Sequence, residues 1–301
     1  MMAAVEAYLA LRRAAGFAMS NAEYLLRSFA RFAAARGERH VRTTTLIDWA
    51  SQGRSLAQRH ARYQAVCKFA SQLRLEDAGH ELPPPNYFGY RKTRRIPHIY
   101  SLAELDRLML AAGRLTPRGT LRPQTYVTLI GLLASTGMRV SEALSLRVAD
   151  VTSDGLLIRK TKFQKTRLVP LHDTALAALR SYLERRLSMH TGGDHVFVGS
   201  NGQPLTYGAV YPVFGTVLKA AGVPGPQGRR RRLHELRHTF AVRALESAPA
   251  GRQRIGQHMV ALATYLGHVN IDATYWYLQT TAELLVDIAA AGETFFTGEQ
   301  S

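Results

Sequence analysis

The chain has a single cysteine, Cys67, in 301 residues. One thiol cannot form an internal disulfide, and it cannot supply the paired cysteines of a structural zinc site. Small secreted folds held by disulfides and cysteine-type zinc fingers are therefore excluded. Cys67 lies in a segment whose apolar residues recur at helical spacing, so we expect it to be a small residue of a helical core.

Long apolar runs are also absent. No run reaches the ~18 residues that a membrane-spanning helix needs. The first residues lack the basic-then-apolar order of a secretory signal, because Glu6 comes early and Arg12 and Arg13 come late. We therefore expect a soluble cytoplasmic protein with no membrane partner.

Acidic residues are scarce, since 22 Asp and Glu stand against 39 Lys and Arg, a formal net charge of +17. Residues 1–99 hold 16 basic and 7 acidic residues (+9), and residues 100–301 hold 23 and 15 (+8). Basic charge spread over the whole chain indicates a polyanionic partner, most simply nucleic acid, which would associate the protein with the nucleoid. The alternative is a basic protein that binds no polyanion.

The hydrophobic fraction of 46% and the chain length suit two domains with packed cores. Apolar residues at helical spacing predict that residues 1–82 form a bundle of short helices. The second of these helices is expected to be capped by Ser20 or Asn21. Arginines outside such a bundle can bind a DNA backbone, or they can form an ordinary solvated face. The four predicted helices cover about 3–15, 20–35, 46–50 and 56–75.

Residues 83–99 are predicted to form an interdomain linker. Three consecutive prolines, Pro83 to Pro85, cannot continue a helix, and the basic run that follows has no apolar period. We expect this linker to run along the nucleic acid. Its candidate DNA-binding residues are Arg91, Lys92, Arg94 and Arg95.

A second domain is predicted over residues 100–301. Ser101 and Glu104 have the spacing of a capping box at the start of a helix. A nearly all-apolar segment, about 123–136, predicts a central buried helix that Gly137 ends. A tail helix is expected at 281–291, after helices at 174–187 and 207–221 and a loop at 247–256.

Two short strands are predicted at 156–159 and 167–171, joined by a basic hairpin tip that contains Lys162 and Lys165. A lysine at such a tip can reach a phosphate or enter a groove. The predicted fold class is therefore mainly α with a small antiparallel β-sheet.

Arg139 lies at the junction of two apolar segments, where an arginine needs a partner. Glu142 follows three residues later on a new helix. The two side chains can form a plain structural ion pair, or Glu142 can hold Arg139 in place for an anionic ligand.

The segment HELRHTF, which begins at His234, allows two chemistries. As H-E-x-x-H, it would hold zinc through His234 and His238, with Glu235 as base. As H-x-x-R, it places His234 and Arg237 on one helix face, where both can bind a phosphate. The extended metalloprotease form fails because positions 241 and 244 are alanines, so the phosphate interpretation is favoured.

Four segments in order resemble the motifs of the tyrosine recombinase (phage integrase) family. The resemblance covers the whole second domain, and it implies an N-terminal core-binding bundle that contacts DNA and an α+β catalytic domain. The segments are TGMRVSEAL (Thr136–Leu144), TKFQKTRLVPL (Thr161–Leu171), LHELRHTFA (Leu233–Ala241) and YLGHVNIDATYWYL (Tyr265–Leu278).

The resemblance implies the role of each motif residue. Glu142 would support the first arginine, and the family uses no metal or nucleotide cofactor. Tyr275 is a rival nucleophile, but residues two apart on a helix face about 200° apart, so only one tyrosine can reach the phosphate. The implied catalytic residues are Arg139 and Arg237 (phosphate oxygens), Lys162 (proton donor to the leaving 5′ oxygen), His234 (proton transfer), His268 (phosphate hydrogen bond) and Tyr277 (nucleophile).

The resemblance also implies an activity: site-specific cleavage and rejoining of double-stranded DNA through a 3′-phosphotyrosyl intermediate and a Holliday junction. Such enzymes act as homo-tetramers on DNA, some together with related recombinases, and the role expected here is integration or excision of a mobile element. The alternatives are a DNA-relaxing enzyme of the type IB topoisomerase kind and a DNA-binding protein without catalysis. Further DNA contacts are expected from Lys165, Arg229, Arg230, Arg231 and Arg232.

Overall fold

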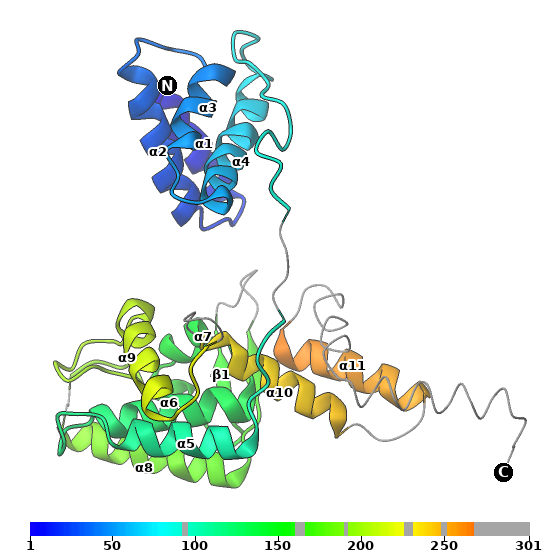
Figure 1. Ribbon diagram of the computed structural model, residues 1–301. Helices are drawn as coiled ribbons and strands as arrows, with labels where there is room; N and C mark the ends of the chain where they lie inside the picture. The colour runs from blue at the N-terminus through cyan, green and yellow to red at the C-terminus, as the bar shows by residue number, and fades with distance from the viewer. Residues whose placement is uncertain (92–95, 160–165, 190–191, 226–230, 248–251, 268–301) are drawn as a thin grey trace, which may run out of the picture. The chain divides into compact units, whose positions relative to one another are not determined.

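The computed structural model describes residues 1–91, 96–159, 166–189, 192–225, 231–247 and 252–267, without the side chains of 252–256. The chain divides into two compact units, Met1–Arg95 and Ile96–Ser301. Figure 1 shows that both are mainly helical, with one small sheet in the second. The predicted fold class is therefore confirmed. Among the described residues, no helix is long and apolar enough to cross a membrane.

The N-terminal unit is a bundle of helices around an aromatic core. Trp49 packs edge-on against Phe29, with ring centroids 5.4 Å apart, and the Arg62 guanidinium lies over the Trp49 ring, 4.1 Å from its centroid. The second helix begins at Ser20, one residue after Met19 in the left-handed conformation (φ 54°), so the predicted side-chain cap is absent. The helices are α1 (Met2–Ala14), α2 (Ser20–Ala34), α3 (Thr43–Ser51) and α4 (Leu56–Leu73).

The proline run packs against this bundle. Tyr63 on α4 is fully buried, and its hydroxyl donates a 2.8 Å hydrogen bond to the Pro84 carbonyl. Glu81 accepts a hydrogen bond from the Thr43 amide at 2.7 Å and so ties the same segment to the start of α3. The described part of the predicted linker is thus anchored to the N-terminal unit at its beginning.

The second unit is organised around one buried helix, α6. Its apolar side chains pack against α5, α8 and α10, and Figure 1 shows these helices around it. This confirms the predicted central helix and the Ser101–Glu104 capping box at the start of α5. The helices before α10 are α5 (Leu102–Gly113), α6 (Arg122–Thr136), α7 (Val140–Leu144), α8 (Asp173–Met189) and α9 (Tyr207–Ala220), with a 3-10 turn, η1, at Val148–Asp150.

A two-stranded antiparallel sheet carries the hairpin. Strand β1 (Leu156–Ile158) pairs with β2 (Arg167–Val169), and Ile158 lies opposite Arg167. The turn before β1 requires glycine, because a Cβ on Gly155 (φ 132°) would lie 2.3 Å from the Val169 carbonyl oxygen. The strand register places Arg167 at the end of the sheet that leads into the hairpin tip.

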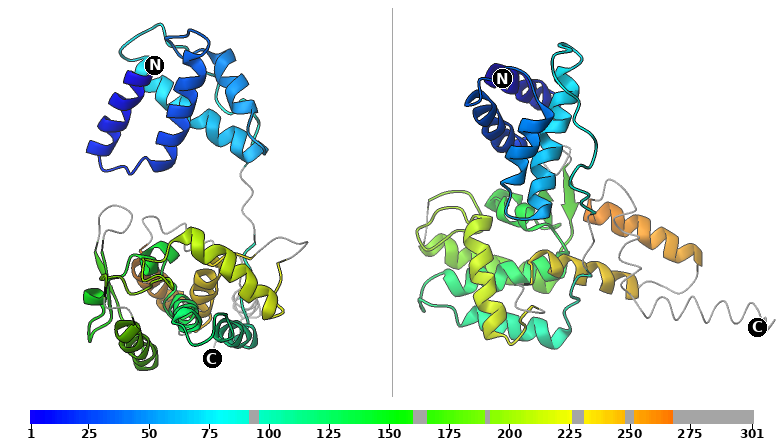
Figure 2. Two further views of the ribbon diagram at one scale, coloured as in Figure 1. Left: turned by 90° about the vertical axis from the view of Figure 1, so that its left-hand side faces the viewer. Right: turned by 45° about the horizontal axis from the view of Figure 1, so that its top comes forward.

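Helix α10 (His234–Glu246) and helix α11 (Arg252–Leu266) lie side by side (Figure 2). Their contact is a small apolar cluster that includes Val242, Leu245, Met259 and Leu266. The predicted loop over 247–256 is wrong from Arg252 onward, because α11 begins there and its packing against α10 supports the helix despite Gly256.

Candidate active site

Gly137 begins the candidate site, because it ends α6 and redirects the chain. It adopts a left-handed conformation (φ 59°), and a Cβ there would lie 2.4 Å from Cδ1 of Phe240 on α10. Only glycine fits both the conformation and the space. The chain then turns, and Arg139 becomes the N-cap residue of α7.

Glu142 holds Arg139 in two ways. Its carboxylate accepts hydrogen bonds from the Arg139 amide at 2.9 Å and from the Arg139 Nη1 at 2.8 Å. The Glu142 side chain is 7% exposed and that of Arg139 28%, so the arginine remains accessible while its partner is buried. The predicted ion pair is therefore present, with the carboxylate at the positive end of a short helix.

Arg167 also binds Glu142, which the sequence analysis missed. Its Nη1 and Nη2 donate to the two carboxylate oxygens at 3.0 and 2.8 Å, in a bidentate pair. Burial raises the pKa of Glu142, but hydrogen bonds from Arg167 and Arg139 outweigh it and lower the value to about 2. The sequence feature that could have indicated this pairing is the position of Arg167 at the start of the second predicted strand of the hairpin.

Arg237 on α10 is 2% exposed. Its Nη1 donates to the Gly137 carbonyl and its Nη2 to the Leu266 carbonyl, both at 2.7 Å. Arg139 Nη2 donates to the Gly267 carbonyl at 3.1 Å. The carboxyl end of α11 thus holds both arginines, and the negative end of the helix dipole favours that arrangement.

His234 is the first residue of α10, and part of the residue is open to solvent although protein groups surround its ring. Its ring packs edge-on against the buried His238, with centroids 4.8 Å apart. Desolvation, and then the positive charges of Arg237, Arg232 and Arg139, lower the pKa of His234 below its ordinary value of 6.5. The imidazole is therefore neutral at pH 7 and can accept a proton.

Lys162, His268 and Tyr277 lie outside the described residues, as does the predicted tail helix at 281–291. His268 follows Gly267 directly in the sequence, and Lys162 lies between β1 and β2. The same holds for the DNA-binding candidates Lys92, Arg94, Arg95, Lys165, Arg229 and Arg230. Among the described candidates, Arg91 and Arg232 are exposed, and Arg231 Nε donates to the Pro224 carbonyl at 3.2 Å.

The zinc interpretation of HELRH gains no third ligand in the described part of the chain. There, the only group of three His, Cys, Asp or Glu side chains with ligand atoms close together is His40, Asp77 and His80 of the N-terminal unit. His80 Nδ1 accepts a 3.0 Å hydrogen bond from the Val41 amide, which suits a neutral ring with its proton on Nε2. Metal-bound histidines donate from their second nitrogen, so this group does not fit a metal either.

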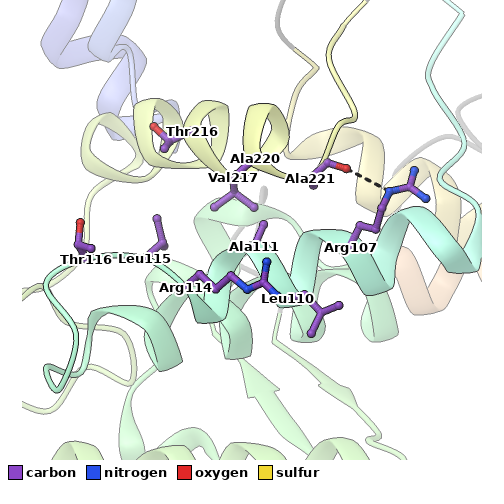
Figure 3. Close-up of a pocket in the computed structure, with 10 residues that line it drawn as sticks. All are labelled: Arg107, Leu110, Ala111, Arg114, Leu115, Thr116, Thr216, Val217, Ala220 and Ala221. Carbon is purple, nitrogen blue, oxygen red and sulfur yellow. Dashed lines mark hydrogen bonds between the residues drawn. The ribbon is translucent and has the colours of Figure 1, made fainter.

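A cavity of about 350 Å³ lies between α5 and α9 (Figure 3). Arg107 Nε donates to the Ala221 carbonyl at one end of it, at 3.0 Å, and Leu110 and Val217 form part of its apolar wall. None of the described site residues lines it. The candidate site is the arginine cluster at the end of α11, apart from this cavity.

Solved structures share this fold. The Tn1549 transposon integrase, in complex with transposon right end DNA, superposes with a TM-score of 0.64 at 17% identity. The match covers 98% of this chain and 99% of that one. The two units and their order therefore follow the fold of a DNA integrase.

Relatives by sequence define the class. A putative integrase/recombinase of Sinorhizobium fredii, y4rB, is 35% identical over 293 residues, which cover 94% of this chain and 93% of that protein. The tyrosine recombinase XerD of Halalkalibacterium halodurans is 27% identical over 266 residues, covering 85% and 83%. The class is that of DNA strand transferases of the tyrosine recombinase type.

The family model described as the phage integrase family matches residues 103–283, more than half of the chain. The chain belongs to the phage integrase family, and the resemblance predicted from its four motifs is confirmed. It is an enzyme of site-specific DNA recombination.

Proposed function

We propose that Tyr277 cleaves one DNA strand at a phosphate held by Arg139 and Arg237. The observation that carries this proposal is the convergence of the two guanidinium groups on adjacent carbonyls at the end of α11. His268 follows that point directly, and Tyr277 comes nine residues later. Paired guanidinium groups suit the non-bridging oxygens of a phosphodiester, whose charge they stabilise as the transition state forms.

The reaction is a phosphoryl transfer without net hydrolysis. The Tyr277 oxygen forms a bond to phosphorus, the bond from phosphorus to the 5′ oxygen breaks, and a 3′-phosphotyrosyl link remains. The tyrosine proton passes to the neutral imidazole of His234, and Lys162 protonates the leaving 5′ oxygen. His268 donates a hydrogen bond to the phosphate. Attack by another 5′ hydroxyl reverses these steps and joins two strands.

Both units of the chain contribute to DNA binding in this proposal. The helical bundle of residues 1–82 and the basic linker of 83–99 contact the duplex, while residues 100–301 carry the chemistry. Four copies would exchange strands through a Holliday junction, as in the lambda integrase tetramer bound to such a junction, a fold neighbour of this chain. The transposon integrase fold and the integrase relatives favour integration or excision of a mobile element as the biological role.

Trapping of the covalent intermediate tests the proposal. The full chain first selects a duplex from a randomised pool, and that duplex is then synthesised with a nick at each position in turn. Loss of the short fragment beside the nick should trap a protein–DNA adduct with the wild-type chain and none with Tyr277→Phe. Tyr275→Phe is the matched control and should still form the adduct.

The outcomes separate the alternatives. An adduct that persists in Tyr277→Phe but not in Tyr275→Phe would move the nucleophile to Tyr275. Binding without any adduct would support the non-catalytic alternative. Exchange between two selected sites supports recombination, whereas relaxation of a plasmid without exchange supports the type IB topoisomerase alternative.

A further inference from the structure

Glu142 receives four hydrogen bonds from two arginines. Arg139 donates through its amide and Nη1, and Arg167 donates through Nη1 and Nη2. The Glu142 side chain is almost fully buried, so water contributes little to neutralising it. Its charge must therefore be balanced by the arginines themselves.

The charges of this cluster do not cancel. Glu142 and Arg139 alone would form a neutral pair, and a neutral pair attracts a phosphate weakly. With Arg167 added, two positive charges face one negative charge, and the cluster as a whole is positive. Because Arg167 donates to both carboxylate oxygens and is itself largely buried, it satisfies Glu142, while Arg139 remains the more exposed of the two arginines.

Arg167 also contacts the segment that binds Arg139. A Cβ on Gly267 would lie 2.9 Å from the Arg167 Nη1, so the guanidinium packs against the glycine backbone. The carbonyl of the same Gly267 accepts a hydrogen bond from Arg139 Nη2. Arg167 therefore lies against two residues that bind Arg139, namely Glu142 and Gly267.

The position of Arg167 in the sheet adds a connection to the hairpin. It is the first residue of β2 and pairs with Ile158 at the end of β1, the two strands that flank the segment containing Lys162. Its bidentate pair with Glu142 consequently ties the hairpin to α7.

We propose that Arg167 is a positioning residue for strand cleavage, which neutralises Glu142 and so leaves the charge of Arg139 available to the scissile phosphate. This inference rests on the proposed function. It makes no claim that Arg167 touches the DNA.

The test measures single-turnover adduct formation on the nicked duplex together with duplex affinity. Arg167→Met should lower the cleavage rate about 10- to 100-fold, the range typical of residues that orient a catalytic group, while Kd for the duplex changes less than about threefold. Arg167→Lys keeps the charge without the bidentate geometry, so its cleavage rate should lie between those of the wild-type chain and Arg167→Met.

A double variant separates electrostatics from folding. In Arg167→Met/Glu142→Gln the carboxylate that would neutralise Arg139 is gone, so the cleavage rate should recover about tenfold relative to Arg167→Met alone. A purely structural role predicts no recovery, because the double variant has lost more hydrogen bonds. The thermal unfolding of each variant is measured alongside its cleavage rate, so that a loss of stability can be distinguished from a loss of cleavage.

The matched control is Arg159→Met. Arg159 also flanks the hairpin and pairs through Nε with a buried carboxylate, Asp150, at 2.5 Å. It should lose stability without a specific loss of cleavage. The inference is overturned if Arg167→Met and Arg159→Met cleave at equal rates, or if the double variant is no faster than Arg167→Met. In either case, adduct formation by the wild-type chain still supports the proposed function. A wild-type chain that binds the duplex without forming an adduct overturns both.

Discussion

Arg139 and Arg237 donate hydrogen bonds to the carbonyl oxygens of two consecutive residues, Gly267 and Leu266. The two arginines come from different helices, and the end of a third helix brings them together. Because each carbonyl fixes one guanidinium nitrogen, the spacing of the two positive groups is set by a single peptide unit. Backbone groups therefore fix the positions of the two arginines that we propose bind the phosphate.

Arg237→Lys should impair cleavage although it keeps the charge. An ammonium group cannot reach both the Gly137 and Leu266 carbonyls, which the planar guanidinium binds at 2.7 Å. We expect the single-turnover cleavage rate to fall about 10²- to 10³-fold, with duplex affinity little changed. Arg243→Lys on the same helix, where the arginine binds one carbonyl, that of Tyr100, is the control. Similar losses in both variants would contradict a specific role for Arg237.

Gly137→Ala should destabilise the second unit. The residue would hold an unfavourable positive φ and place its Cβ within 2.4 Å of the Phe240 ring. Together these effects should cost about 2–4 kcal/mol of unfolding free energy, measured by chemical denaturation. Gly222→Ala has a similar φ of 67° but no neighbour within 4 Å, so it should cost about 1 kcal/mol. Equal costs would show that the contact with Phe240 is unimportant.

The cleavage rate should fall in acid at a pH below the ordinary histidine range. Desolvation and the surrounding arginines lower the pKa of His234 from 6.5. The ring therefore stays neutral, and able to accept a proton, until the pH falls below this lowered pKa. Arg232→Gln removes one of these charges and should move the acid limb of the pH–rate profile upward. A limb at or above pH 6.5 in the wild-type chain would contradict this assignment.

The same shift affects stability with a definite sign. Because the folded pKa of His234 is lowered, the unfolded chain takes up the proton first as the pH falls. The contribution of His234 to stability is thus complete above about pH 6.5 and is lost progressively toward the lower folded pKa. Comparison of denaturation profiles of the wild-type chain and His234→Gln across this range measures that contribution.

Chelation of divalent metals should leave cleavage unchanged. The positive charges of Arg237, Arg232 and Arg139 lower the pKa of His234, and the same charges disfavour a divalent cation at this motif. Incubation with a zinc chelator followed by the adduct assay measures the effect. Loss of cleavage that added zinc restores would revive the metal interpretation of this motif.

The fold class, the order of most elements and the family could be predicted from the amino-acid sequence. Periodicity located the buried helix α6, the Gly137 stop and the two strands, because these depend on local propensity and on a pattern that one segment carries. It failed at the start of α11, because the loop predicted over 247–256 runs past Arg252, where packing against α10 supports a helix despite Gly256.

Only the tertiary structure shows which carboxylate and carbonyl groups bind Arg139 and Arg237. Motif spacing indicated Arg139, Arg237 and Glu142, but the bond from Arg237 to the Gly137 carbonyl joins segments that are far apart in the chain. The pairing of Arg167 with Glu142 likewise depends on how the hairpin packs beside α7. Every residue has a main-chain carbonyl, so the sequence cannot indicate which carbonyls bind Arg139 and Arg237; only the packing of α6, α10 and α11 shows this.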